Sequence, residues 1–404
     1  MTSILPARGF WRHAAALLSA LLISACAAPP AAPPPPPPSN QPVPFEQAIA
    51  TATDALAAQL QPARPANLLA QLQGKSVKQA IVLDPSLDAG SGQQTAGTQQ
   101  MDKLVSERLA GRAEQFEVLP FRAANLARAQ LLLTGTLTRL SQAYRLNLAL
   151  TDLKTGVVAA QAWSVATDTT VDMSPLPYYR DSPVLVKDKV IDGYVLTSAT
   201  PPGQRGDAVY LERIATATVI NEAMVSYNAE RYEEALGQYR SALATPAGEQ
   251  MRVLNGIYLA TSKLNRPAEA ETAFGRVVAF GIAANELGVK FLFNPNSTDF
   301  WSDSKVSGPY TMWLRQIARE ARSAKVCMDV VGHTSKTGSE AYNDALSLRR
   351  AAAIRQRLGT ESPEMTMRAK PLGMGFRQNL VGSGSDDAVD ALDRRVEFKI
   401  VACP

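Results

Sequence analysis

The sequence predicts a multidomain α+β protein, and three patterns in its 404 residues lead to that prediction. Closely spaced alternating strands between residues 131 and 166 predict an N-terminal α/β domain with an antiparallel meander. A helical pattern in residues 207–285 recurs after 35 residues, which predicts a short helical repeat region. A strand, a polar loop and an amphipathic helix between residues 326 and 354 predict a third, C-terminal unit. The apolar fraction of 46% is sufficient for several hydrophobic cores.

Residues 1–25 have the layout of a secretory signal. Arg8 and Arg12 precede an apolar run at residues 14–23, which is too short for a mature membrane span. The next residues, Ile-Ser-Ala-Cys, resemble the lipobox of bacterial lipoproteins. That resemblance implies cleavage before Cys26, acylation of Cys26 by palmitate and, because Ala27 follows, an outer-membrane location facing the periplasm. The alternative is a soluble secreted protein with an incidental cysteine.

Residues 26–44 are mostly proline and alanine and predict a stiff stalk behind the anchor. Such a segment buries no core and adopts polyproline II, which rises about 3.1 Å per residue, so residues 29–44 would reach roughly 50 Å. A stalk of this kind lifts folded domains off a membrane.

Residues 45–167 predict the N-terminal domain. Helical spacing at residues 45–60 and 101–109 alternates with short strands at residues 80–83 and 116–119. Strands at residues 131–140, 144–150 and 157–166 then form the meander, for which we expect one solvent-exposed face. This segment resembles the domain shared by FlgO, CsgG and LpoB-type periplasmic lipoproteins.

Residues 168–206 contain five prolines without a clear period and predict an exposed connector to the helical region. In residues 207–285 small and aromatic positions recur: Tyr232, Ala235, Tyr239 and Ala242, then Pro267, Ala270, Phe274 and Val277. This spacing resembles the tetratricopeptide repeat, which implies a protein partner at the helices. The alternative is a plain helical spacer.

The most informative stretch is residues 332–351, GHTSKTGSEAYNDALSLRRA. Alternating apolar residues before it predict a strand that ends at Gly332, so the polar loop lies at the strand's C-terminal end. Loop N–H groups and the N-terminus of the next helix suit a carboxylate or another anion there. On that helix we expect Arg350 to flank the loop and Arg349 to face solvent.

These residues resemble the signature of the OmpA C-terminal-like family, which binds peptidoglycan and includes the Pal-type lipoproteins. The matching positions are Gly332, His333, Thr334, Gly338, Tyr342, Asn343, Leu346, Ser347, Arg350, Ala351, Gly373, Gly375, Asp393, Arg394, Arg395, Val396 and Glu397. The match spans residues 287–404 and implies a βαβαβ sandwich that holds diaminopimelate of the wall's stem peptide. The binding residues implied are Thr334, Ser335, Asn343, Leu346, Arg350 and Arg394.

The chain departs from that signature at Ser335, where the family has the aspartate that takes the ligand's ammonium. A hydrogen bond between a carboxylate and an ammonium is worth roughly 1.5–3 kcal/mol. A hydrogen bond from the same ammonium to a serine hydroxyl is worth about a third to a half of that. Arg350 is retained and can take the ligand's carboxylate, while Glu340 in the same loop is a candidate for the missing charge.

Cysteine usage predicts a disulfide. Once Cys26 is assigned to lipid, Cys327 and Cys403 remain as a pair in an oxidising compartment. Cys327 opens the strand before the signature loop and Cys403 follows the last strand, so antiparallel neighbours would bring them together. Two buried free thiols are the alternative.

The sequence gives no support for an enzyme, a cofactor, a metal site or a nucleic-acid partner. The formal net charge is only +4, and the sequence shows no cluster of Lys and Arg residues of the kind that binds nucleic acid. Of the two histidines, His13 lies in the signal, so His333 alone is too little for a His-rich zinc site. A triad of Ser335, His333 and Asp329 is excluded because neighbours along one strand and loop do not converge on one point.

Two functional hypotheses remain. The first is an outer-membrane lipoprotein that links the membrane to peptidoglycan by non-covalent binding of the stem peptide. The second is an assembly or scaffold component of an envelope-spanning secretion, appendage or wall-synthesis machine, in which Ser335 has weakened or removed the wall contact.

Overall fold

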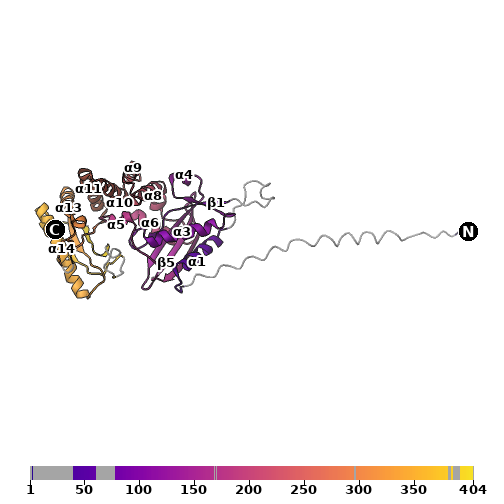
Figure 1. Cartoon of the computed structure of the whole chain (residues 1–404), viewed down its shortest axis with the longest axis horizontal. Helices are drawn as coiled ribbons and strands as arrows, with labels where there is room; N and C mark the ends of the chain where they lie inside the picture. Colours follow the sequence, from indigo (N-terminus) through magenta and orange to yellow (C-terminus); the bar gives the residue numbers. More distant parts are fainter. Residues whose placement is uncertain are drawn as a thin grey trace. The chain divides into compact units, whose positions relative to one another are not determined.

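The computed structural model describes residues 40–60, 78–167, 171–294, 297–380 and 392–403, with single residues 2, 169 and 384 (Figure 1). Cys26 and most of the proline-rich stalk lie outside these residues. None of the helices in the described ranges has the length and apolar character that a membrane span requires.

The N-terminal domain is built on one mixed sheet with the order β3-β1-β4-β5-β6, to which β2 adds at β4. The strands are β1 (Gln79–Leu83), β2 (Leu87–Asp88), β3 (Phe116–Pro120), β4 (Leu131–Arg139), β5 (Ala143–Asp152) and β6 (Val158–Thr167). β1 pairs in parallel with β3 and β4, whereas β4, β5 and β6 pair antiparallel as a meander. Alternating apolar residues and tight turns explain why these three strands follow one another so closely.

Both faces of this sheet are covered, so the expectation of one solvent-exposed face is wrong. Helices α1 (Phe45–Ala58) and α3 (Ala96–Ala110) pack on one face, and α6 (Lys189–Ala199) packs on the other. Tyr194 of α6 lies with Val82 and Leu132 in this second core. The sequence analysis missed α6 because it lies in the proline-bearing segment at residues 168–206. The prolines flank this helix, as expected from the cost of a proline inside one, and Asp188 caps its N-terminus.

Two carboxyl groups close to this sheet make the stability of the fold dependent on pH. Burial raises the pKa of Asp84 to about 6, even though the Tyr210 hydroxyl donates to its Oδ2 at 2.6 Å. Burial, together with the charge of Asp84, raises the pKa of Asp102 to about 7. Since the folded chain holds these protons more tightly than the unfolded chain, the free energy of unfolding falls as the pH rises from about 4 to about 7. We expect a lower melting temperature at pH 7.5 than at pH 5.

Asp102→Asn should flatten this pH dependence, because asparagine keeps an acceptor for the Ser86 N–H and carries no charge. Melting curves of both proteins at several pH values measure the effect. An unchanged slope in Asp102→Asn would remove Asp102 as a cause.

Four helices follow, and each packs on the next: α8 (Ile214–Asn228), α9 (Tyr232–Leu243), α10 (Met251–Lys263) and α11 (Pro267–Ala284). Two short helices precede them, α5 (Pro177–Asp181) and α7 (Ala208–Leu211). Close crossing needs small residues: a Cβ at Gly256 of α10 would overlap the ring of Tyr239 of α9. Phe274 of α11 stacks on Trp313 at 5.5 Å between ring centroids. The helices and the C-terminal domain therefore share one core.

The C-terminal domain is a four-stranded sheet with the order β7-β10-β8-β9, on which two long helices pack. Its elements are β7 (Leu287–Val289), α12 (Ser304–Ser307), α13 (Tyr310–Ser323), β8 (Cys327–Gly332), α14 (Glu340–Glu361), α15 (Met365–Arg368), β9 (Ala369–Gly373) and β10 (Val396–Val401). Leaving out the short helices, the chain runs βαβαβ from β7 to β9, and β10 inserts antiparallel between β7 and β8. The outer edge of β7 is covered, since Leu185 N–H donates to Gly288 O at 3.0 Å.

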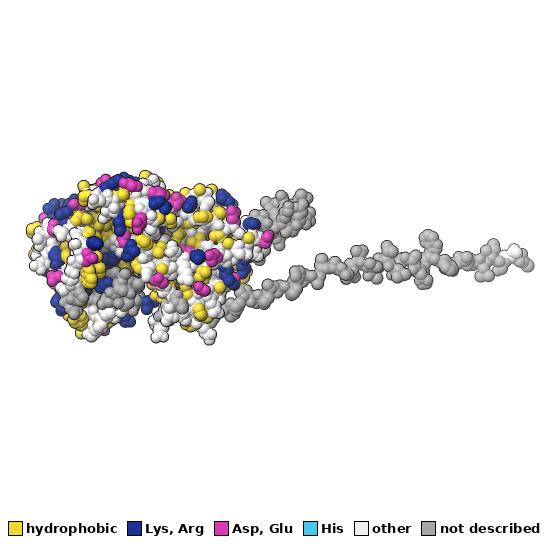
Figure 2. Space-filling model, in the orientation of Figure 1, with side chains coloured by type: hydrophobic (Ala, Val, Ile, Leu, Met, Phe, Trp, Pro, Cys, Tyr) yellow, Lys and Arg dark blue, Asp and Glu magenta, His cyan; other side chains and the backbone are white. Residues whose placement is uncertain are grey.

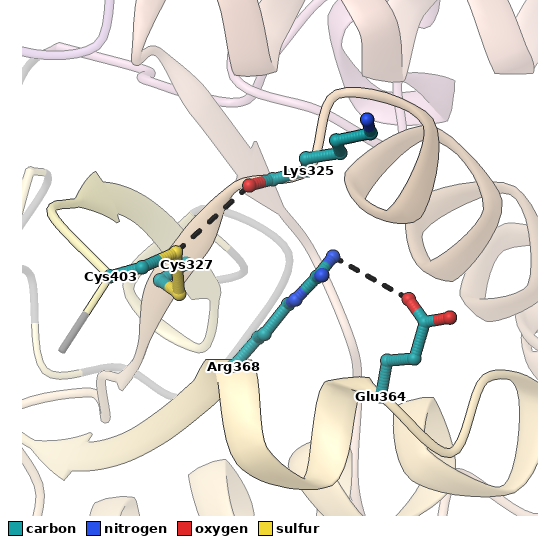
Figure 3. Close-up of a disulfide and its surroundings, with 5 residues drawn as sticks. All are labelled: Lys325, Cys327, Glu364, Arg368 and Cys403. Carbon is teal, nitrogen blue, oxygen red and sulfur yellow. Dashed lines mark hydrogen bonds and ion pairs between the residues drawn. A yellow bond between two sulfur atoms is a disulfide. The ribbon is translucent and has the colours of Figure 1, made fainter.

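Cys327 and Cys403 form a disulfide, as the sequence predicts. Figure 3 shows the bond where β8 begins and the chain ends, with Arg368 of α15 paired to Glu364 nearby at 3.5 Å. The bond therefore fastens the end of β10 to β8.

Candidate functional site: a cationic cavity at the signature loop

The signature loop leaves the end of β8 at a point where α14 approaches the sheet very closely. A Cβ at Gly332 would overlap the carbonyl oxygen of Ser347, and one at Gly373 would lie 2.7 Å from Leu348 N. Glycine is therefore required at both strand ends. Ser347 Oγ accepts from Gly375 N–H at 3.0 Å, which ties the first turns of α14 to the chain after β9.

Hydrogen bonds to backbone groups fix the conformation of the loop. Thr334 N–H donates to Gly375 O at 2.9 Å, and Asn343 Nδ2 donates to Thr337 O at 2.6 Å and Ser339 O at 3.0 Å. Gly338 has a φ of +83°, a conformation that favours glycine. Asn343 thus shapes the loop, while the hydroxyls of Thr334 and Ser335 remain at its inner side among the cavity-lining residues.

His333 lies buried between the end of β8 and β10, next to the loop. Its side chain is buried, and its Nε2 lies 3.6 Å from Glu397 Oε1 on β10. Burial lowers the pKa of His333, so the ring is neutral at pH 7. Burial opposes ionisation of Glu397, but His333 and the charge of Arg395 outweigh it and hold the pKa of that carboxyl well below its usual range. This arrangement links the end of β8 to β10 beside the loop.

Arg350 and Arg349 divide as the helical pattern predicts, with Arg350 buried and Arg349 exposed. The Arg350 guanidinium lies 4.9 Å from the centroid of the Phe293 ring, and its Nε donates to Ser297 O at 3.3 Å. Its Nη2 also donates to Asn294 O at 3.4 Å. These contacts fix the orientation of a planar cation of the kind that pairs well with a carboxylate.

All six predicted binding residues line one cavity of about 830 Å³. They are Thr334, Ser335, Asn343, Leu346, Arg350 and Arg394. The volume falls in the range of small-molecule sites, roughly 300–1,000 Å³. Aromatic rings form part of the wall, and Trp301 among them is 39% exposed.

Part of the cavity lining comes from residues outside the signature that sequence reasoning missed: Arg180, Asp181, Lys263 and Lys290. α5, α10 and the residue after β7 bring them together through tertiary packing. No local motif marks them: Arg180 and Asp181 lie within residues 168–206, whereas Lys263 and Lys290 lie in later segments of the chain.

The cavity is cationic. Among the described residues that line it, six are Lys or Arg and one, Asp181, is acidic. Glu340 does not supply the charge missing at Ser335, because it is exposed and pairs with Arg377 at 3.0 Å. The face of the molecule in Figure 2 shows Lys, Arg, Asp and Glu side chains interspersed, without a broad patch of one sign.

No curated protein matches the chain. Three similar solved structures are the peptidoglycan-associated lipoprotein from Burkholderia pseudomallei, the cell wall anchor of the T6SS from Pseudomonas aeruginosa and the periplasmic domain of MotB from Helicobacter pylori. Their identities are 23%, 23% and 17%, with TM-scores of 0.23, 0.24 and 0.22. The matches cover 28%, 29% and 29% of this chain and 88%, 80% and 74% of the other chains. The OmpA family model matches residues 292–390, so this part of the chain is similar to the OmpA family.

Proposed function

We propose that the chain is a periplasm-facing envelope protein that binds the peptidoglycan stem peptide non-covalently through the C-terminal cavity. The observation that supports this most is that the six signature residues line one cationic cavity of sufficient size. The proposed role is binding, without catalysis, cofactor or metal.

The proposed chemistry divides the diaminopimelate end group between two parts of the site. Arg350 takes the carboxylate bidentately, since its guanidinium is already oriented by Phe293 and Ser297. The ammonium faces the loop, where Ser335 offers a neutral hydroxyl in place of the family's carboxylate. We therefore propose a weaker contact than an intact signature would give.

Ser335→Asp is expected to tighten binding of a diaminopimelate stem peptide about tenfold, or roughly 1–2 kcal/mol, because it restores a charged partner for the ammonium. Ser335→Asn is the matched control, with similar volume and no charge. Calorimetric titration of the three proteins measures the difference. Equal affinities for Ser335→Asp and Ser335→Asn would show that the ammonium does not face this residue.

We further propose that Cys26 carries lipid and that residues 26–44 raise the folded domains from the outer membrane towards the wall. The basis is the lipobox resemblance and the proline content of the stalk. Cys26→Ser should leave the protein unprocessed or released from the envelope fraction, and it should remove palmitate labelling. Normal membrane retention of Cys26→Ser would reject the lipoprotein assignment.

A second candidate is a scaffold that docks an envelope machine through tetratricopeptide-like helices α8 to α11. Two observations favour it: Ser335 replaces the family's carboxylate, and Val225 on α8 is an apolar side chain with 52% exposure. In that case the N-terminal domain and the helices carry the function, and the C-terminal domain only positions them.

Cosedimentation of the chain lacking residues 1–25 with purified peptidoglycan separates the two candidates. The anchor predicts protein in the pellet and release by soluble stem peptide. Protein that stays in the supernatant at every peptidoglycan concentration, with an unchanged melting curve, would favour the scaffold.

A further inference from the structure

The cavity lining outside the signature loop contains a lysine, Lys290, whose ammonium group is only partly hydrogen-bonded by the described residues. Lys290 follows β7, and its backbone N–H donates to Pro183 O at 2.8 Å. Its Nζ donates to the carbonyls of Tyr179 at 3.2 Å and Arg180 at 3.3 Å. The ammonium group of Lys290 carries three hydrogens, and two of them are donated to these carbonyls. No other hydrogen-bond acceptor for this ammonium lies among the described residues.

The acidic residue of this part of the lining is already engaged. Asp181 accepts from Lys263 at 2.9 Å, from Arg180 at 3.0 Å and from the Tyr227 hydroxyl at 3.0 Å. The negative charge of Asp181 is therefore balanced by Arg180 and Lys263. In the part of the chain that the structure describes, Asp181 forms no ion pair with Lys290 within 4.0 Å. Burial lowers the pKa of Lys290 to about 8, with a partial offset from the charge of Asp181. A partly dehydrated cation at the wall of a cavity favours an anionic ligand group.

We propose that Lys290 forms a second carboxylate subsite, which takes the carboxylate of the glutamate next to diaminopimelate in the same stem peptide. This inference rests on the proposed function, in which Arg350 holds the diaminopimelate carboxylate. Both residues line one cavity of about 830 Å³, which is large enough for a short peptide. The ligand class is therefore a stem peptide with a free glutamate carboxylate, in preference to its amidated form.

A purely structural role for Lys290 is the competing explanation. The carbonyls of Tyr179 and Arg180 lie at the C-terminal end of α5, where unpaired carbonyls are commonly met by a lysine. That role affects the stability of α5 and the shape of the cavity wall. It gives no reason to distinguish a carboxylate from an amide on the ligand.

The test is a titration with two synthetic tripeptides, alanine–γ-glutamate–diaminopimelate, that differ only in a free or an amidated glutamate α-carboxylate. The unmodified protein should bind the free form about tenfold more tightly. Lys290→Gln should bring the two affinities to within about twofold by weakening only the free form. Lys370→Gln, an exposed lysine on β9 outside the cavity, is the control for net charge and should keep the preference.

Each result supports or overturns the subsite. Equal affinity of the unmodified protein for both tripeptides would overturn it and leave the proposed function standing. Equal weakening of both tripeptides in Lys290→Gln would also overturn it, in favour of the structural role at α5. If neither tripeptide binds the unmodified protein at millimolar concentration, both the subsite and the proposed function fail.

Discussion

Arg350→Ala is expected to abolish measurable binding of a diaminopimelate stem peptide. In the proposed complex the substitution leaves the ligand carboxylate without its bidentate partner, at a cost of roughly 2–4 kcal/mol. In the proposed function Ser335 already makes the contact weaker than an intact signature would, so a loss of this size should take binding beyond the reach of calorimetry. Arg350 is 7% exposed and rests on Phe293, so alanine also removes packing.

Two variants separate the loss of the ligand contact from a loss of fold. Arg349→Ala removes the adjacent but exposed arginine of the same helix and should leave affinity unchanged. Arg350→Lys keeps the positive charge but removes the planar guanidinium that forms two parallel hydrogen bonds. It should bind more weakly than the unmodified protein and more tightly than Arg350→Ala. An Arg350→Ala protein with a normal melting curve and an affinity within threefold of the unmodified protein would contradict the assignment.

Replacing both Cys327 and Cys403 by alanine is expected to destabilise the C-terminal domain by up to roughly 4 kcal/mol. The bond closes a loop of 76 residues, and without it the unfolded chain gains conformational freedom. We expect the largest loss of stability at β10, because the disulfide fastens the end of this strand to β8. β10 lies between β7 and β8, so its loosening affects both neighbouring strands. We expect the melting transition of this domain to shift down by several degrees.

The corresponding experiment compares melting curves of the double variant and the unmodified protein with and without a reducing agent. Reduction should lower the transition of the unmodified protein and leave that of the double variant in place. A transition that is insensitive to reduction and equal in both proteins would show that the disulfide adds no stability.

The core of the candidate site was predictable because its requirements are local in the sequence. Gly332 and Gly373 are fixed by the close approach of α14, and Arg350 follows from the helical period that begins in the loop. For the same reason the division between buried Arg350 and exposed Arg349 was correct. A charge partner is not a local property: Glu340 lies in the loop, yet it pairs with Arg377 from the segment after β9.

The cavity lining outside the signature was not predictable, because it arises only when distant segments meet. Lys290 and Asp181 lie more than a hundred residues apart in the chain and line the same cavity. Similarly, α6 covers the N-terminal sheet from a segment whose prolines obscured an eleven-residue helix. Short helices flanked by prolines give a weak periodic signal, and tertiary packing decides their place.

The central claim is that the cavity between the signature loop and Lys290 holds the stem peptide. The most direct measurement is a crystal structure of the chain lacking residues 1–25 in complex with the alanine–γ-glutamate–diaminopimelate tripeptide. We predict the diaminopimelate carboxylate at two hydrogen bonds from the Arg350 guanidinium, about 2.7–2.9 Å each, and its ammonium beside Ser335. A tripeptide bound at any other surface, with this cavity empty, would contradict the account.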